Sequence, residues 1–409
     1  MLVGPIKSSL DLTDVQVGIL MGGAFAVTYV TFGIPIGIIA DRFSRKRIVC
    51  LALLTWSLAT IASGFAHSFA ELLACRMIVG VGEAAMTPCA FSIISDIFPP
   101  NRRGLPLSIY QMGAQLGSIF SILAGGLLID WTTARGPISA FNLTFQPWQQ
   151  VLITVGAPGF ILCLLPLGLR EPQRSKSTNL RHAGLQARSF VLANKNLLIL
   201  LFVAFGLAMI LTAALTAWLP EYLIRTFRMS HGAVGKQLSL AHLCSPVGLL
   251  ITGLLSDRLS RQGYKDSPLR VFSWMALISL PIVFGAFFTG SAVLSILCIA
   301  LTYLFFFPFM GLASNALQGI VPPDLRGAAA GVFMSFVNLL GMGVGPLLIG
   351  FLTVYIFKDD AKLGEALGII SLPIIAGVWV LTSMARKRFG VAVGINAERL
   401  AVGTVQSSA

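Results

Sequence analysis

Apolar residues dominate this chain in long runs that are separated by short polar segments. Eleven runs reach about the 20 residues that a helix needs to cross a bilayer. They lie near 16–40, 48–66, 71–94, 105–129, 149–169, 197–219, 236–256, 271–288, 292–318, 328–356 and 366–384. Several contain proline, which membrane helices tolerate because neighbouring helices re-satisfy the freed backbone groups. The pattern predicts an all-α membrane protein with about eleven spans.

The composition supports this fold class. Hydrophobic residues make up 56% of the 409 residues and charged residues only 11%, whereas soluble domains carry about 25% charged residues. This excludes a soluble enzyme, a disordered chain and a disulfide scaffold. The six cysteines lie within or beside apolar runs without metal-ligand spacing, so we expect neither a metal nor another cofactor.

The basic residues indicate orientation rather than nucleic-acid binding. Of the 29 Lys and Arg residues, 21 lie in one alternating set of loops and seven in the other. Cytoplasmic loops carry the excess of Lys and Arg, so the C-terminus is expected in the cytoplasm, as in a bacterial inner-membrane protein. Eleven spans then place Met1 outside. The apolar stub before Lys7 is too short to span, so we expect one more spanning helix ahead of Met1.

Two segments recur in the two halves of the chain. The sequence GIIADRFSRKR from Gly37 reappears as GLLSDRLSRQG from Gly253, and IFPPNRRG from Ile97 reappears as IVPPDLRG from Ile320. All four segments fall in loops assigned to the cytoplasm. Two parallel repeats of several spans predict a transporter whose substrate site lies between the halves near mid-membrane.

The first repeated segment resembles the signature loop of the major facilitator superfamily. Gly37, Asp41, Arg42 and Arg45 match its pattern, and Ser44 stands where the family usually has glycine. The resemblance covers the chain apart from a first helix. It implies two six-helix bundles, expected at 1–169 (helices 2–6) and 197–385 (helices 7–12), a cytoplasmic central loop at 170–196 and a cytoplasmic tail at 386–409.

Within that superfamily, the fourth helix resembles two branches. The sequence CRMIVGVGEAAMTP resembles the spinster-like branch, whose members handle lysolipids and related amphiphiles. The spacing of Arg76, Gly80 and Glu83 also resembles the organic-anion symporters, and this motif does not separate the two branches. The fifth helix lacks the Gly-Pro pair of drug antiporters, which disfavours a multidrug antiporter without excluding it.

Arg76 and Glu83 are the charged residues that lie deep within an expected span. A charge at the centre of a span costs about 2.5–3.5 kcal/mol, so such residues usually mark an ion or substrate pathway. Seven residues apart, they share one helix face about 10.5 Å apart along the axis. Glu83 is expected to bind a proton, and Arg76 to tune it or hold an anionic head group. The alternative is a structural pair that bridges helices.

The repeat suggests that the halves differ in chemistry. An offset of 223 residues maps Arg76 to Ile299 and Glu83 to Phe306, so the second half lacks this charged pair. The aromatic run from Tyr303 is expected to form an apolar substrate wall. Further polar residues within spans are candidates for the cavity or for interhelical hydrogen bonds: Gln111, Gln115, His242, Tyr303, Asn315 and Asn338.

The repeated loops are expected to form a cytoplasmic gate. Arg45 can reach Asp96 at the end of the fourth helix, and the family resemblance implies that Asp41 contacts the facing half. The expected gate residues are Gly37, Asp41, Arg42, Arg45, Asp96, Asp257, Arg258 and Arg261. The alternative is that these charges only set topology. Three Gly-x-x-x-Gly pairs, at Gly33/Gly37, Gly113/Gly117 and Gly341/Gly345, predict close helix packing.

These observations favour a monomeric secondary transporter that works by alternating access. We expect proton coupling and a small organic or amphiphilic solute, either lysolipid-like or an organic anion. A multidrug-type efflux antiporter and a non-transporting membrane sensor are the alternatives. An enzyme is disfavoured because the spans contain no cluster of catalytic groups, and the chain has no P-loop for ATP.

Overall fold

The fold is all-α and membrane-spanning, as the hydropathy predicts. A computed structural model describes residues 1–40, 43–98, 104–140, 142–168, 171, 180–322 and 325–407. In this part of the chain, eleven helical segments are long and apolar enough to cross a membrane. They are Asp14–Gly37, Arg45–Ser63, Phe69–Ile97, Met112–Arg135, Pro147–Gly168, Arg188–Phe227, His231–Arg261, Ser267–Phe288, Ala292–Ile320, Ala329–Phe357 and Asp360–Gly394.

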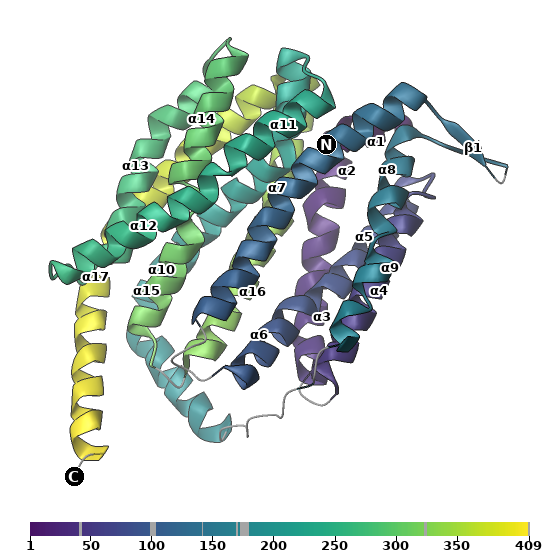
Figure 1. Ribbon diagram of the computed structural model, residues 1–409. Helices are drawn as coiled ribbons and strands as arrows, with labels where there is room; N and C mark the ends of the chain where they lie inside the picture. The colour runs from purple at the N-terminus through teal and green to yellow at the C-terminus, as the bar shows by residue number, and fades with distance from the viewer. Residues whose placement is uncertain are drawn as a thin grey trace. The chain divides into compact units, whose positions relative to one another are not determined.

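The chain packs into two compact units, and the first contains most of the N-terminal elements. This unit 1 comprises Met1–Lys176, Ala213–Leu240 and Met342–Ala366. Up to Gly168 its elements are α1 (Val3–Leu10), α2 (Asp14–Gly18), the π-helix η1 (Ile19–Gly23), α3 (Ala24–Ala40), α4 (Arg45–Ser63), α5 (Phe69–Ala84), α6 (Met86–Ile97), α7 (Gly104–Arg135), β1 (Ile138–Ala140), β2 (Leu143–Phe145), α8 (Pro147–Gly156), α9 (Gly159–Leu162) and the 3₁₀ turn η3 (Leu165–Gly168). The antiparallel hairpin β1–β2 follows α7 (Figure 1).

Unit 2 comprises Ser177–Thr212, Ala241–Gly341 and Leu367–Ala409. It contains α12 (Cys244–Arg261), α13 (Ser267–Phe288), α14 (Ala292–Phe305) and α15 (Phe309–Ile320). Several elements are shared between the units or return to unit 1: α10 (Leu180–Phe227), α11 (His231–His242), α16 (Arg326–Phe351), η5 (Leu352–Phe357), η6 (Asp360–Lys362) and α17 (Leu363–Ser407). The expected central loop is helical from Leu180 onward. The bundle boundaries expected from the sequence stay a prediction.

Proline interrupts two of the spans in the same way. Pro88 has no N–H to offer the carbonyl of Ala84, and its ring crowds that carbonyl, so α5 ends there and α6 starts at Met86. Pro308 likewise separates α14 from α15. Both repeats therefore have a span that is broken near its middle.

Close packing in unit 1 occurs at glycines other than those expected. A Cβ at Gly80 would come within 3.0 Å of the Phe25 carbonyl oxygen, so its absence lets α3 and α5 touch. The expected approach at Gly33/Gly37 and at Gly113/Gly117 is wrong in the described chain, because nothing lies within 4 Å of a Cβ built at these positions. In the third expected pair, by contrast, a Cβ at Gly341 would come within 2.9 Å of the Met209 carbonyl oxygen of α10. The Gly-x-x-x-Gly spacing alone therefore did not separate glycines at helix contacts from the others.

An aromatic cluster forms part of the core of unit 2. Phe205 stacks on Phe272 with ring centroids 5.3 Å apart, and Phe272 lies 6.0 Å from Phe309. Ile299 and Phe306, which the repeat aligns with Arg76 and Glu83, are both buried. The charged positions of the first repeat are thus apolar core positions in the second.

Candidate functional site

Helix α5 positions both of the charged residues that the sequence singled out. The Ser68 hydroxyl caps the helix by accepting a hydrogen bond from the Glu71 backbone N–H at 3.3 Å. Arg76 follows two turns later, and Glu83 lies at the end of the helix, beside the proline break. Both side chains are half-buried.

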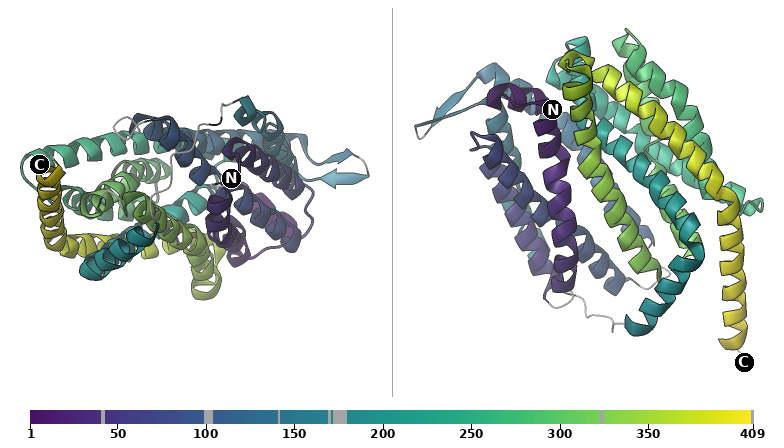
Figure 2. Two further views of the ribbon diagram at one scale, coloured as in Figure 1. Left: turned by 90° about the horizontal axis from the view of Figure 1, so that it is seen from below. Right: turned by 180° about the vertical axis from the view of Figure 1, so that it is seen from behind.

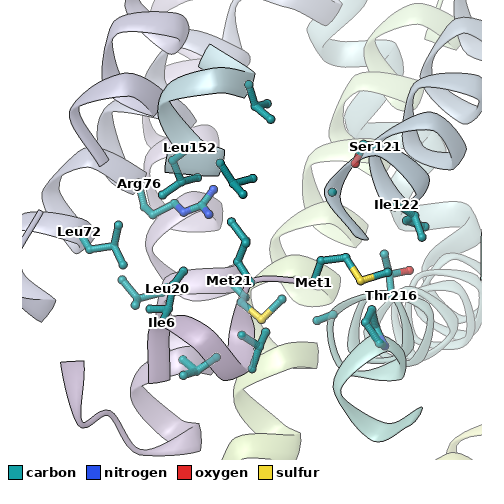
Figure 3. Close-up of a pocket in the computed structure, with 18 of the residues that line it drawn as sticks. Met1, Ile6, Leu20, Met21, Leu72, Arg76, Ser121, Ile122, Leu152 and Thr216 are labelled. Atoms are coloured by element: carbon teal, nitrogen blue, oxygen red, sulfur yellow. The ribbon is translucent and has the colours of Figure 1, made fainter. Parts of the chain in front are cut away.

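Arg76 projects into a pocket of about 330 Å³ in unit 1 (Figure 3). Among the described residues Arg76 is the one charged side chain in the lining, and three hydroxyl side chains accompany it, from Ser118, Ser121 and Thr216. The remaining walls are mostly apolar. They include Ile6 from α1, Leu20 and Met21 from η1, Leu72 from α5, Ile122 from α7, and Leu152 and Val155 from α8.

Arg76 has no anionic partner in the part of the chain that the structure describes. No salt bridge involves it there, and neither does any hydrogen bond. A guanidinium offers five N–H donors in a rigid fork that matches a carboxylate or a phosphate. The pocket therefore presents a guanidinium without a described anionic partner beside mostly apolar walls, an arrangement that suits an amphiphilic anion.

The wall of the pocket on α8 is backed by a buried tryptophan. Trp148 lies one turn before Val151 and Leu152, both of which line the pocket. Its side chain is only 2% exposed. Its indole Nε1 has no hydrogen-bond partner within the described structure.

Glu83 lies in a separate cluster of tyrosines rather than in this pocket. Tyr29 on α3 lies near Glu83, near Thr87 of α6 and near Tyr110 of α7. Tyr110 in turn packs edge-on against Phe91, with ring centroids 5.7 Å apart. No cation pairs with Glu83 among the described residues. Three helices, α3, α6 and α7, thus bring hydroxyl groups together around Tyr29, next to one half-buried carboxyl group.

Sequence reasoning missed this tyrosine cluster. Tyr29 stands in an apolar run and Tyr110 begins one, so neither breaks the hydropathy pattern. A search for polar residues within spans could have found Tyr29, as it found Gln111. The side chain of Gln111 lies outside the described residues.

The loop that carries the signature motif contains a buried Arg45. Its guanidinium forms an ion pair with Asp96. Its Nη1 donates to the Ser92 hydroxyl at 2.8 Å, and its Nε donates to Glu171 at 3.0 Å. The Arg45 side chain is only 1% exposed. Asp41 and Arg42, the other expected gate residues of this loop, lie outside the described residues. Gly37 is described, and no neighbour approaches its Cβ position there.

Glu171 caps α4 from a distant part of the chain. Its carboxylate accepts hydrogen bonds from the Ser44 hydroxyl at 2.7 Å and from the backbone N–H groups of Arg45 and Lys46 at 3.0 and 3.2 Å. Partial burial raises the pKa of Glu171, but these hydrogen bonds and the Arg45 side chain outweigh it and lower the pKa to about 2. A carboxylate is favoured at a helix N-terminus by the same backbone donors.

The second copy of the motif does not reproduce this arrangement. Asp257, Arg258 and Arg261 are exposed, and they form no ion pair within the described chain. Instead Asp266 pairs with Arg270 at 3.1 Å and Arg386 at 2.7 Å. Burial raises the pKa of Asp266, but the two arginines outweigh it and lower the pKa below its usual range.

The remaining cavity candidates are dispersed. In unit 2, His242 is buried and stacks on Tyr303 with ring centroids 4.4 Å apart, and its Nδ1 has no partner in the described structure. Asn315 is exposed and donates to the Ser256 hydroxyl at 3.5 Å, and Asn338 is half-buried. Gln115 in unit 1 is exposed.

Comparison with known proteins agrees with this fold. A family model described as Major Facilitator Superfamily matches residues 1–346. An MFS-type efflux pump of Mycolicibacterium smegmatis is 31% identical over 389 residues, which cover 92% of this chain and 84% of the pump. Protein spinster homolog 1 of Bos taurus is 28% identical over 385 residues, which cover 87% of this chain and 69% of that protein. The latter similarity confirms the resemblance to the spinster-like branch.

A solved structure has the same fold. It is a bacterial homologue of the human lysosomal transporter Spinster, in an inward-facing and unoccupied conformation. It aligns with a TM-score of 0.78 at 24% identity and covers 97% of this chain and 93% of that one.

Proposed function

Because the chain belongs to the Major Facilitator Superfamily, and is therefore an integral membrane transporter of small molecules rather than an enzyme, we propose that it is a monomeric, proton-coupled secondary transporter. It works by alternating access between two six-helix bundles in a bacterial inner membrane, with a cytoplasmic C-terminus. Its solute is a small amphiphilic or organic anion.

The pocket at Arg76 is the observation that carries the proposed solute class. Its guanidinium pairs with no described carboxylate, and most of the surrounding wall is apolar. A solute with a carboxylate or phosphate head could accept two parallel hydrogen bonds from the Arg76 guanidinium. An acyl or aromatic portion would lie against Leu20, Leu72 and Leu152. Desolvation would strengthen the charged contact, because an ion pair is stronger where the local dielectric constant is low.

Glu83 is the proposed proton site. It is a half-buried carboxyl group within a span, and no described cation holds it ionised. The hydroxyl group of the nearby Tyr29 can donate to a carboxylate or accept from a carboxylic acid, so it suits either protonation state. The break at Ala85 frees backbone around Glu83, and such interrupted helices are where transporters commonly place substrate and ion sites.

The buried Arg45–Asp96 pair is the proposed core of the cytoplasmic gate. Both helices belong to unit 1, so the pair is proposed to hold α4 against α6 and to fix the motif loop in the position from which it closes against the facing half. The exposed Asp257, Arg258 and Arg261 are proposed to act at the same face only when the facing half closes.

Transport assays in proteoliposomes test the coupling. A fluorescent lysophospholipid serves as the solute, and a fluorescent fatty acid as the second anion. An imposed difference of one pH unit supplies about 1.36 kcal/mol per proton, enough for roughly tenfold accumulation. Glu83→Gln keeps size and hydrogen bonding but cannot titrate. We expect this variant to lose gradient-driven accumulation while it retains exchange without a gradient.

The matched control is Glu71→Gln, which removes a carboxylate from the exposed start of the same helix. It should accumulate solute like the unmodified protein. Full accumulation by Glu83→Gln would rule out Glu83 as the proton site. Arg76→Ala should instead weaken binding of both anions and leave an uncharged lipid analogue unaffected. If the unmodified protein moves neither anion, the proposed solute class is wrong.

A further inference from the structure

A fully buried carboxylate begins the first long span. Asp14 is 0% exposed at the side chain, and four donor groups surround it. Lys7 Nζ reaches its Oδ1 at 2.7 Å, and Arg225 binds both oxygens, with Nη1 2.9 Å from Oδ2 and Nη2 3.1 Å from Oδ1. The Thr353 hydroxyl donates to Oδ2 at 3.1 Å. The carboxylate is thus saturated by Lys7 from the preceding helix and by Arg225 and Thr353 from two distant parts of the chain.

The two cations of this group have further anionic partners. Arg225 Nε donates to Glu221 at 2.7 Å, and Glu221 also accepts the Gly4 backbone N–H at 3.1 Å. Lys7 additionally pairs with Asp360. We call this group of six residues the clasp: Lys7, Asp14, Glu221, Arg225, Thr353 and Asp360. It lies within unit 1, yet it joins residues from the first predicted repeat to residues from the second.

Backbone contact between helices shields Asp14 from solvent. Gly350 of α16 lies directly against the backbone of Asp14, and a Cβ at Gly18 would come within 2.9 Å of the Pro346 carbonyl oxygen. The same carbonyl accepts the indole N–H of Trp218 at 2.9 Å. These glycines allow α2 and α16 to touch, which explains how an ionised group at a helix end is fully buried.

The clasp lies immediately beyond one end of the Arg76 pocket. Ile6, Val17 and Pro220 line that pocket, and each is within one helical turn of a clasp residue on the same helix. The other end of unit 1 is distant: α2, η1 and α3 form one continuous rod from Asp14 to Ala40 (Figure 2). At 1.5 Å per residue this rod is about 39 Å long, so the clasp and the Arg45 cluster lie at opposite membrane faces.

We propose that the clasp is a second gate, which holds the two repeats together at the face opposite Arg45 and blocks solute passage between that face and the pocket. Removal of one partner from a buried, hydrogen-bonded ion pair leaves its buried donors without their acceptor, which is strongly unfavourable. The closed arrangement therefore depends on Asp14. Without its carboxylate, Lys7 Nζ and two N–H groups of Arg225 lose an acceptor in the closed arrangement, although Asp360 and Glu221 still balance their charges. Water satisfies these donors once the face opens.

Accessibility of a pocket residue tests the gate without knowledge of the solute. In a variant whose six native cysteines are replaced, Ser121→Cys places a thiol in the pocket. A membrane-impermeant maleimide is added to the face where α1 lies, which the distribution of Lys and Arg assigns to the outside. Asp14→Asn should accelerate labelling by about tenfold, the change that ~1.4 kcal/mol produces in an equilibrium. Thr353→Val, which removes one hydrogen bond, should give a smaller increase.

The matched control is Asp11→Asn. Asp11 lies in the same turn, is exposed, and has a φ of 50° that asparagine also tolerates. The thiol at position 121 should be labelled at the same rate in Asp11→Asn protein as in protein whose clasp is unchanged. Unchanged labelling in monodisperse Asp14→Asn protein, or an equal increase in Asp11→Asn, would overturn the proposal. If Asp14→Asn does not fold, Thr353→Val and Arg225→Lys decide by the same comparison.

Discussion

Single residues in this protein are fixed by partners that lie far away in the sequence. Glu171 bonds to α4 across 126 positions, and Asp14 bonds to Arg225 across 211. Each stands in a polar segment beside an apolar run, where an acidic residue is unremarkable. The sequence therefore predicted that Arg45, which lies in a repeated motif, reaches Asp96 at the end of the fourth helix, but it missed Glu171 and the whole clasp. Hydrophobic periodicity along the sequence does not indicate an ion pair that forms only in the tertiary fold.

Removal of the Arg45 side chain should destabilise the protein markedly. Arg45→Ala leaves Asp96 and Glu171 without their cation, and loss of one partner of a buried pair costs about 3 kcal/mol or more. The matched control is Arg261→Ala at the aligned and exposed position of the second repeat, which should change stability by less than about 0.5 kcal/mol. Thermal unfolding in detergent measures both. Equal effects of the two substitutions would contradict the burial argument.

Glu171 should give the protein a defined loss of stability in acid. Its pKa falls from an ordinary 4.5 to about 2 in the folded protein. A carboxyl group with a lowered pKa contributes stability that is fully present above the ordinary value and is lost as the pH falls through the folded value. Melting temperatures recorded from neutral pH down toward about pH 3 should fall less steeply in Glu171→Gln than in the unmodified protein. Parallel curves would disprove this contribution.

At the scale of elements, hydropathy predicted the spans well and their packing poorly. Eleven apolar runs became eleven spanning segments because run length and mean hydropathy are local properties. The helix breaks at Pro88 and Pro308 follow from chemistry that the sequence displays directly. Close helix contacts do not: Gly33 and Gly37 have no near neighbour at their Cβ positions, whereas Gly18 and Gly80 do. The spacing of glycines does not show which face of a uniformly apolar helix packs against a neighbouring helix.

The break between α5 and α6 should matter for transport more than for folding. Pro88→Ala restores an N–H that can bond to Ala84, and a continuous helix would move Glu83 relative to Tyr29. Misplacement by 1 Å at a reacting centre can cost about a hundredfold, so we expect gradient-driven uptake to fall at least tenfold, with stability within about 1 kcal/mol. Pro308→Ala, which removes the corresponding break between α14 and α15, should impair uptake less. The same proteoliposome assay ranks the two variants, and equal losses would mean that the break acts only on packing.

For the whole molecule, the distribution of charges predicts a single orientation. We expect a reporter fused after residue 409 to be on the cytoplasmic side, so a C-terminal green fluorescent protein should fluoresce and a C-terminal alkaline phosphatase should be inactive. Substitution of Arg386, Lys387 and Arg388 by glutamine removes part of the Lys and Arg excess that sets orientation, and should raise the phosphatase activity if that excess is limiting. Active phosphatase on the unmodified chain would reverse the assigned topology.

The buried Trp148 gives the protein a built-in optical probe. Its indole lies one turn from the pocket wall and finds no hydrogen-bond partner in the described structure. An indole in such dry, apolar surroundings emits at shorter wavelength than one in water. If the pocket floods with water or fills with an acyl chain, the emission of a variant with Trp148 as its sole tryptophan should move to longer or shorter wavelength accordingly. Occupancy of the pocket could then be followed in real time, in the membrane and without a label on the solute.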